Sequence, residues 1–323
     1  MSTYLETTAD VYRNAALTPD VGLCCTTTPI WQLPNLTIPK IMQEMNYGCG
    51  STVHPRDLVN NPNILYVGVG GGMEVLQFAY FSRKKEGVIG IDVVDEMLTA
   101  CADNLKEAEV SNDWFQHDFV SLRKGSALSL PVADSIIDVA AQNCLFNIFT
   151  QEDLKVALKE MYRVLKPHGR LVLSDPVTEQ VMPEALRNDE RLRALCLSGS
   201  LSLKDYIQMI TEAGFGTVEI RAKRPYRILD PLHYNTVENI LLESVEVCAI
   251  KDPMPGDGPC VFTGKAALYF GEEAYFDDHK GHVLMYNQPL SVCDKTANAL
   301  LGLNRSDIHI TASTYFYDGG GCC

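Results

Sequence analysis

Cysteine is the residue type in this sequence with the most distinctive chemistry. Eleven cysteines stand at positions 24, 25, 49, 101, 144, 196, 248, 260, 293, 322 and 323, and none has the C-x-x-C spacing of a zinc ribbon or a thioredoxin-like motif. Thiolates bind soft, thiophilic centres in preference to ions that favour oxygen. The opening residues are not a basic segment followed by an apolar one, so we expect a cytoplasmic protein with reduced thiols.

A second group of residues has the spacing of a nucleoside site. Gly68, Gly70 and Gly72 lie between a predicted strand and a predicted helix, where glycine lets the backbone approach a ligand and the helix N-terminus faces its polar groups. A dinucleotide fingerprint needs its third glycine at position 73, which is Met73, so the spacing favours a nucleoside without a pyrophosphate. Asp92 ends the next predicted strand, where a carboxylate can accept hydrogen bonds from both ribose hydroxyls.

Alternating strands and helices position these residues. The predicted strands cover 64–68, 87–92, 136–141, 170–174 and 217–221, and the predicted helices cover 73–82, 95–108, 151–165 and 183–213. This alternation predicts an α/β fold with a doubly wound, mostly parallel sheet and helices on both faces. Ligands of such a sheet bind at the carboxyl ends of its strands, so a second substrate must reach the nucleoside there. Cys144 lies at this edge, because it follows the strand over 136–141.

Composition divides the chain into three parts. Five prolines within the first sixty residues interrupt every helix there except one near residues 38–45, so we interpret residues 1–60 as an irregular N-terminal cap that carries part of the thiol site. Residues 61–225 form the predicted nucleoside-binding domain. Short candidate strands and turns follow, which predicts a smaller α+β domain over 226–323 that ends in Cys322 and Cys323.

The charge of the chain limits its partners. The 323 residues include 27 Lys and Arg against 41 Asp and Glu, which gives a formal net charge of −14. Nucleic-acid affinity comes mainly from Lys and Arg that displace counterions, so this balance disfavours a nucleic-acid partner. No apolar run reaches the roughly 18 to 20 residues that cross a bilayer. We therefore expect a monomer without nucleic-acid or membrane partners that acts on a small-molecule substrate.

The glycine loop and Asp92 resemble those of the class I S-adenosylmethionine methyltransferases, and the segment Leu165-Lys166-Pro167-His168-Gly169 is similar to their turn before the fifth strand. Two positions depart from that family. Tyr66 stands where an acid usually precedes the loop, and Ser126 stands where an acid or amide often lies near the adenine. The resemblance implies S-adenosylmethionine as the cofactor. The cofactor-binding residues that it implies are Tyr47, Gly68, Gly70, Gly72, Asp92, Val93, Met97, Ser126, Ala127 and Asn143.

The contexts of the cysteines sharpen the resemblance to the arsenite S-adenosylmethionine methyltransferases. The segments Cys24-Cys25-Thr26-Thr27, Tyr47-Gly48-Cys49-Gly50, Asn143-Cys144 and Cys196 are similar, in this order, to that family's four cysteine positions, and 292–297 and 317–323 resemble its C-terminal region. The resemblance implies trivalent arsenic held by Cys49, Cys144 and Cys196, while Cys25, or its neighbour Cys24, completes the set early or exchanges ligands. It also implies a thiol reductant of the glutathione or thioredoxin type as co-substrate.

The chemistry of arsenic suits such a site. Trivalent arsenic bound by three thiolates is pyramidal, and its outward lone pair is a nucleophile that needs no general base once it is held in line with a sulfonium methyl. Two alternatives stay open: a methyltransferase for a small organic acceptor, with the cysteines in the core, and a thiol-based metalloid-binding protein without catalysis. Cys101 shares a predicted helix face with Met97 and Leu105, so we expect it in the core.

Overall fold

A sheet of eight strands forms the centre of the computed structural model, which describes residues 3–20, 23 and 31–317. Its strand order is β3-β2-β1-β4-β5-β7-β6-β8, and neighbouring strands are parallel except that β7 runs antiparallel to both β5 and β6. The strands are β1 Ile64–Val67, β2 Val88–Asp92, β3 Val120–Lys124, β4 Ile137–Asn143, β5 Leu165–Val177, β6 Thr217–Leu229, β7 Ile240–Ile250 and β8 Cys260–Phe262. The predicted doubly wound, mostly parallel α/β sheet is confirmed.

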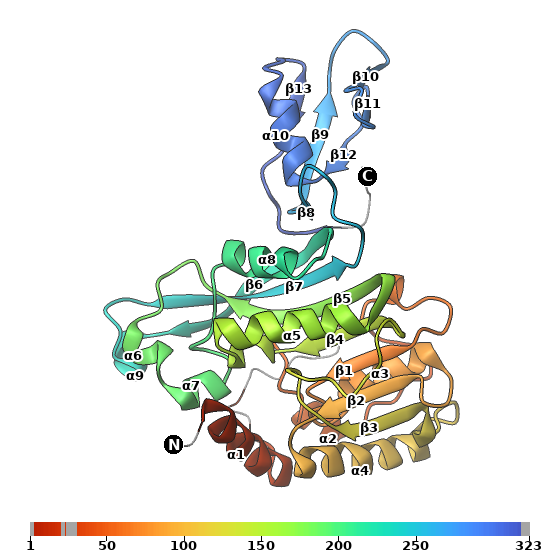
Figure 1. The fold of residues 1–323 in the computed structure, drawn as a ribbon, viewed down its shortest axis with the longest axis vertical. Helices are drawn as coiled ribbons and strands as arrows, with labels where there is room; N and C mark the ends of the chain where they lie inside the picture. The colour runs from red at the N-terminus through yellow and green to blue at the C-terminus, as the bar shows by residue number, and fades with distance from the viewer. Residues whose placement is uncertain (1–2, 21–22, 24–30, 318–323) are drawn as a thin grey trace.

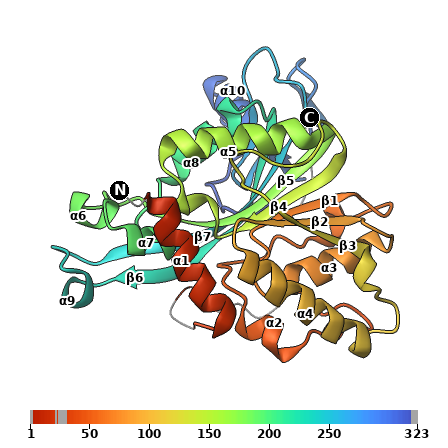
Figure 2. The ribbon, with the colours of Figure 1, turned by 60° about the horizontal axis from the view of Figure 1, so that its bottom comes forward.

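Helices cover both faces of this sheet (Figure 1). The four long helices of the core are α3 Met73–Ser82, α4 Asp95–Ser111, α5 Gln151–Val164 and α8 Leu203–Glu212. α3 and α4 lie on one face, and α5 and α8 lie on the other (Figure 2). Alternate strand residues supply the two cores, since Tyr66 of β1 belongs to the same hydrophobic cluster as Phe78 of α3, and Leu65 to the same cluster as Leu158 of α5.

Helix α1, Tyr4–Leu17, corrects the expectation of an irregular N-terminal segment. The prolines that suggested it begin at Pro19, beyond the end of this helix. The Thr3 amide donates to Glu6 Oε2 at 2.8 Å, and the Thr-x-x-Glu spacing is a helix-start signal that the sequence carries. α1 packs against α4 and against α7, Glu190–Ala194, and so connects them (Figure 2). The helix expected near residues 38–45 is present as α2, Lys40–Glu44.

The predicted break over 166–169 lies inside strand β5. Ile137 of β4 pairs with Leu165, whereas Val139 pairs with Arg170, so the β5 backbone bulges between these two pairs. His168 within the bulge has a positive φ of 60°. The strand therefore begins earlier than the predicted 170–174, and it continues to Val177.

The C-terminal part contains a small unit with its own hydrophobic cluster, which projects away from the large sheet (Figure 1). Its elements are β9 Lys265–Tyr269, β10 Tyr275–Asp277, β11 Val283–Met285, β12 Leu290–Val292, α10 Asp294–Gly302 and β13 Ile308–Ile310. β9 pairs with β12 and β13, and β10 pairs with β11, all antiparallel. β7 and β8 follow the predicted domain boundary at residue 226, yet they are strands of the large sheet.

The other helices of the described chain are short. They are α6 Glu184–Arg187 and α9 Pro231–Tyr234, with 3-10 turns over Pro55–Asp57, His117–Phe119 and Phe146–Ile148. The helical region predicted over 183–213 is divided into α6, α7 and α8. Within residues 3–20, 23 and 31–317, no helix is both long and apolar enough to cross a membrane.

Candidate functional site

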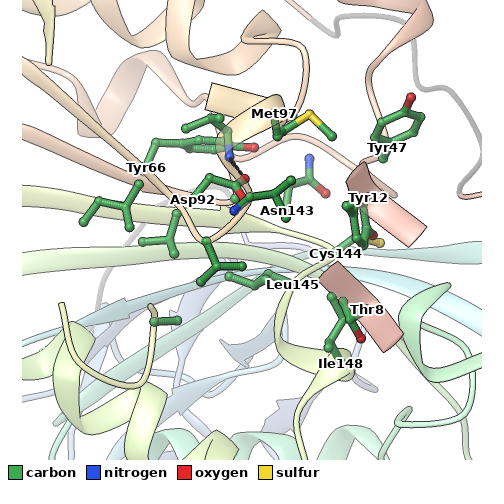
Figure 3. A pocket seen from close by; sticks show the side chains of 18 of the residues that line it. Thr8, Tyr12, Tyr47, Tyr66, Asp92, Met97, Asn143, Cys144, Leu145 and Ile148 are labelled. Atoms are coloured by element: carbon green, nitrogen blue, oxygen red, sulfur yellow. Dashed lines mark hydrogen bonds between the residues drawn. The ribbon is translucent and has the colours of Figure 1, made fainter. Parts of the chain in front are cut away.

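A cavity of about 290 Å³ lies where β1, β2 and β4 end at their carboxyl sides. This is the end of a doubly wound sheet at which ligands bind. Helix α1 closes one side of the cavity, where Thr8 and Tyr12 line it (Figure 3). The predicted cofactor residues that line the cavity are Tyr47, Gly68, Gly70, Asp92, Val93, Met97, Ser126, Ala127 and Asn143. Nine of the ten predicted cofactor residues are therefore brought together.

The glycine loop after β1 has a backbone that glycine adopts without strain. The φ angle is +83° at Gly68, +50° at Gly70 and +89° at Gly72. Gly72 is the N-cap of α3 and does not line the cavity. A Cβ at this position would lie 2.9 Å from the Cys101 Sγ of α4. Gly68 and Gly70 thus face the ligand space, whereas Gly72 permits the close contact between α3 and α4.

Asp92 ends β2, and its side chain reaches the cavity (Figure 3). Its Oδ2 accepts a hydrogen bond from the Val69 amide at 3.1 Å, and its Oδ1 accepts one from the Val94 amide at 3.0 Å. Burial raises the pKa of the Asp92 carboxyl to about 6, although these amides favour the ionised form. Each carboxylate oxygen keeps a further lone pair, so the group fits the two hydroxyls of a ribose.

A buried carboxylate contacts Tyr66, which stands where the resembled family usually has an acid. The Tyr66 hydroxyl donates to Glu74 Oε2 at 2.6 Å. Glu74 stands in the first turn of α3 and lines the cavity, yet it is only 4% exposed. Burial raises the pKa of the Glu74 carboxyl, and burial beside this carboxylate raises the pKa of Tyr66. Sequence reasoning missed Glu74, although an acid in the first turn after a glycine loop was a readable signal.

The three predicted thiol ligands lie around the ends of β4 and β5. Cys144 directly follows β4 and lines the cavity, and its amide donates to the Ser174 carbonyl of β5 at 2.8 Å. The Cys196 thiol donates to the Cys144 carbonyl. The Cys49 Sγ lies 3.4 Å from the Ser174 Oγ. Contacts with Cys144 and Ser174 therefore bring cysteines from three separate segments into one neighbourhood.

Two of these cysteines have an uncommon backbone conformation. The φ angle is +57° at Cys144 and +58° at Cys196, in the left-handed region that residues other than glycine rarely adopt. Residues persist there only where the surrounding structure fixes them, and such positions cluster at functional sites. Neither is exposed by more than 3%. The two cysteines are thus held rigidly at the price of local strain.

The thiols do not converge on one point in this conformation. Among residues 3–20, 23 and 31–317, no three His, Cys, Asp or Glu side chains are placed to hold a metal ion. The Cys196 thiol is directed at the Cys144 carbonyl, and Cys144 alone of the three lines the cavity. Cys25, the remaining predicted site residue, lies outside the described residues.

A buried carboxyl group supports the turn that carries Cys144. Asp175 accepts hydrogen bonds from the Tyr206 hydroxyl at 2.7 Å and from the Gln142 side-chain amide. The Gln142 Oε1 in turn accepts from the Leu145 amide at 2.8 Å. Burial raises the pKa of the Asp175 carboxyl to about 7. The sequence analysis did not identify Asp175, because nothing local links it to position 144.

The cysteine expected in the core is found there. Cys101 is fully buried in α4, and Met97 and Leu105 on the same helix are buried with it. Cys248 of β7 is fully buried as well. Burial raises the pKa of both thiols, which keeps them protonated and poor ligands. Cys101 and Cys248 therefore belong to the core, and neither lines the cavity.

Comparison with known proteins assigns the class of the chain. A family model described as a methyltransferase domain matches residues 58–214. The chain is 29% identical over 180 residues to an arsenite methyltransferase of Halobacterium salinarum, which covers 56% of this chain and 44% of that protein. It is 30% identical over 214 residues to an arsenite methyltransferase of Aquipseudomonas alcaligenes. This match covers 64% of this chain and 60% of that protein. The matches thus span about half the length of these relatives.

A solved structure has the same fold. It is the crystal structure of CrArsM, an arsenic(III) S-adenosylmethionine methyltransferase from Chlamydomonas reinhardtii, with a TM-score of 0.58 and 22% identity over 87% of this chain and 95% of that one. The fold, the domain match and the glycine loop with Asp92 define a class I S-adenosylmethionine-dependent methyltransferase. Within this class, the chain is related to the arsenite methyltransferases.

Proposed function

We propose that this enzyme transfers methyl groups from S-adenosylmethionine to thiol-bound trivalent arsenic, first to arsenite and then to methylarsenite. The observation that carries the proposal is the position of Cys144, which lines the cavity and contacts both Cys196 and Ser174. Ser174 in turn borders Cys49. The similarity to arsenite methyltransferases supports the choice of substrate.

Arsenite binding uses the three thiols as ligands. Each As–S bond replaces an As–OH bond, and the thiol proton leaves with the hydroxide as water, so no general base is needed. The Cys196 thiol turns away from the Cys144 carbonyl, and Cys49 exchanges its contact with the Ser174 Oγ for arsenic. Three thiolates leave the arsenic lone pair unused. Because Cys144 lines the cavity, this lone pair is available on the cavity side.

S-adenosylmethionine supplies an electrophilic sulfonium methyl when it is bound. Asp92 accepts the ribose hydroxyls, while Gly68 and Gly70 let the loop backbone approach, so the chain contributes binding and in-line orientation. The arsenic lone pair forms the As–C bond, and the electrons of the broken S–C bond stay on sulfur. Each transfer formally oxidises arsenic by two electrons. Two thiols of a glutathione or thioredoxin type reductant return these electrons by forming one disulfide and releasing two protons. One As–S bond breaks in this step, its thiolate takes up one of the protons, and the methylated arsenic keeps two thiolates.

Speciation of arsenic tests the proposed function. The full chain is incubated with arsenite, glutathione and S-adenosylmethionine, and the arsenic species are separated by chromatography and quantified by mass spectrometry. We expect monomethylated and then dimethylated arsenic, with one S-adenosylhomocysteine formed per methyl group. Binding of S-adenosylmethionine without any methylated arsenic would contradict the assignment of the substrate.

One observation favours a small organic acceptor as a second candidate. Part of the cavity wall is apolar, where Leu5, Ala9, Ile148 and Phe149 line it. An apolar acceptor would bind there without using the thiols. Cys144→Ser distinguishes the candidates, because methylation of an organic acceptor would survive this substitution and methylation of arsenic would not.

A further inference from the structure

We propose that Glu74 is a positioning residue that holds the Cys49 loop, residues 48–52, against the glycine loop and the end of β4. The inference rests on the proposed function, because it assigns Cys49 a fixed place from which it can bind arsenic. It concerns two residues that the sequence did not single out, Glu74 and Thr52. One buried carboxylate thereby links the cofactor side of the site to the thiol side.

Hydrogen-bond donors surround the Glu74 carboxylate. Its Oε1 accepts from the Thr52 amide at 2.9 Å. Its Oε2 accepts from the Thr52 hydroxyl at 3.1 Å, from the Tyr66 hydroxyl at 2.6 Å and from Asn143 Nδ2 at 3.2 Å. Four donors match an ionised carboxylate, which offers only lone pairs. Hydrogen bonds to a charged group are roughly twice as strong as neutral ones, so this carboxylate can hold the loop firmly.

Asn143 carries the constraint from Glu74 to Cys49. Its Nδ2 donates to the Gly50 carbonyl at 2.9 Å as well as to Glu74, and its Oδ1 accepts from the Cys49 amide at 3.0 Å. Asn143 lines the cavity (Figure 3) and immediately precedes Cys144. The same side chain therefore fixes the backbone of Cys49 relative to that of Cys144.

The backbone of the Cys49 loop packs closely against the side chains of Asn143 and Ser174. A Cβ at Gly48 would lie 2.4 Å from Asn143 Nδ2, and a Cβ at Gly50 would lie 2.3 Å from the Ser174 Oγ. Both distances are far below ordinary van der Waals contact. The two glycines allow this approach but contribute no side chains. The loop is held instead by hydrogen bonds to Glu74 and Asn143 and by the Ser51 amide, which donates to Glu246 Oε1 at 3.0 Å.

Glu74 lies close to the glycine loop as well as to the Cys49 loop. Glu74 is the second residue of α3, which begins directly after the glycine loop at its N-cap Gly72. The carboxylate also lies near the helix N-terminus, where the helix dipole favours a negative charge. Glu74 therefore connects the end of the glycine loop to Thr52 and the Cys49 loop through direct hydrogen bonds.

Alkylation of Cys49 in the full chain tests the proposal. Iodoacetamide is added, and the modification of each cysteine is followed by peptide mass spectrometry. In Glu74→Gln the amide nitrogen faces donors, so we expect Cys49, which is 3% exposed in the wild type, to react about tenfold faster. Arsenite affinity should fall by a similar factor, because Cys49 loses its fixed place. Cys101 and Cys248, which are fully buried, should remain unreactive and report an intact fold.

Two substitutions at Thr52 serve as matched variants. Thr52→Val removes the hydroxyl donor and should also speed the alkylation of Cys49, whereas Thr52→Ser keeps it and should match the wild type. Unchanged Cys49 reactivity in a folded Glu74→Gln protein would overturn the proposal, as would lost cofactor affinity with Cys49 still protected. If Glu74→Gln also makes Cys101 and Cys248 reactive, the fold is disturbed, and the reactivity of Cys49 in Thr52→Val then tests the proposal instead. A wild-type enzyme that methylates no arsenic would refute the proposed function but leave the alkylation result standing.

Discussion

The proposed cofactor side and the proposed thiol side of the site are built by different means. The cofactor side takes Gly68, Gly70 and Asp92 from one continuous stretch, in which β1, α3 and β2 follow each other. The thiol side joins distant segments, since Cys196 contacts a residue 52 positions away and Cys49 contacts one 125 positions away. The first is set by backbone geometry, whereas the second depends on buried side-chain hydrogen bonds.

This difference separates binding from chemistry. A change on the thiol side leaves the backbone of the glycine loop untouched, so it should remove methylation while the enzyme still binds its cofactor. A change on the cofactor side should weaken cofactor binding while the thiols still take up arsenite. Measuring methylation, cofactor affinity and arsenite binding in the same variants tests this separation.

The largest effect is expected at Cys144. Because the Cys144 thiol lines the cavity, Cys144→Ser removes a proposed ligand of arsenic and should abolish methylation of both arsenite and methylarsenite. Cys196→Ser should do the same. Affinity for S-adenosylmethionine, measured by calorimetry, should stay near that of the wild type. Full activity of Cys144→Ser would remove arsenic from the account in favour of an organic acceptor.

Cys49→Ser should lose only one of the two transfers. Arsenite takes three thiolates, but methylarsenite has two positions left for sulfur, which Cys144 and Cys196 can fill. We therefore expect no methylation of arsenite and continued methylation of methylarsenite. The measurement is the methylation rate of the folded variant with each substrate, after its binding of S-adenosylmethionine has been checked. Equal failure on both substrates would show that the valence of arsenic does not govern the use of these thiols.

A charge on Asp92 should control cofactor affinity. Asp92→Ala removes an ionised acceptor, and hydrogen bonds to charged groups contribute about 1.5 to 3 kcal/mol, so affinity should fall about 10- to 160-fold. The wild-type pKa of about 6 means that the carboxylate is ionised above pH 6 and protonated below it. Affinity should therefore rise as the pH increases from about 5 to about 7. Arsenite uptake should persist in Asp92→Ala, and an equally steep pH profile in Asp92→Asn would assign the titration to another group.

A smaller effect is expected from Gly50→Ala. The added Cβ would lie 2.3 Å from the Ser174 Oγ and 2.8 Å from Glu246 Oε1, so the Cys49 loop must shift. Arsenite affinity should fall by less than about tenfold, which corresponds to about 1.4 kcal/mol. Gly256→Ala is the matched control, because a Cβ there meets nothing within 4 Å. If the two variants bind arsenite equally well, the loop is less tightly held than its contacts indicate.

The sequence predicted those features that local spacing determines. The parallel sheet, the glycine loop and the place of Asp92 all follow from residues close together in the chain. Helix α1 was missed because its Thr3 and Glu6 signal was outweighed by prolines that begin only at Pro19. Glu74 was seen as a helix residue, but its contacts with Thr52 and Asn143 arise only when three separate segments meet.

The thiol side could be predicted only in part. The resemblance of the cysteine contexts to those of the arsenite methyltransferases implied one site for Cys49, Cys144 and Cys196, and the fold brings these residues close to the ends of β4 and β5. Their orientations could not be read from the sequence, because the positive φ angles at Cys144 and Cys196 depend on surrounding packing. The hydroxyl of Ser174 and the carboxyl of Asp175 support these cysteines across strands, and no local pattern marks such a role.

X-ray absorption at the arsenic edge tests the central claim most directly, that Cys49, Cys144 and Cys196 together hold the substrate. The full chain is loaded with one equivalent of arsenite in the absence of S-adenosylmethionine, and the neighbours of arsenic are counted from the fine structure. The account predicts three sulfur neighbours in the wild type, and two sulfurs with one oxygen in Cys49→Ser. Arsenic bound only by oxygen, or three sulfur neighbours retained in Cys49→Ser, would contradict it.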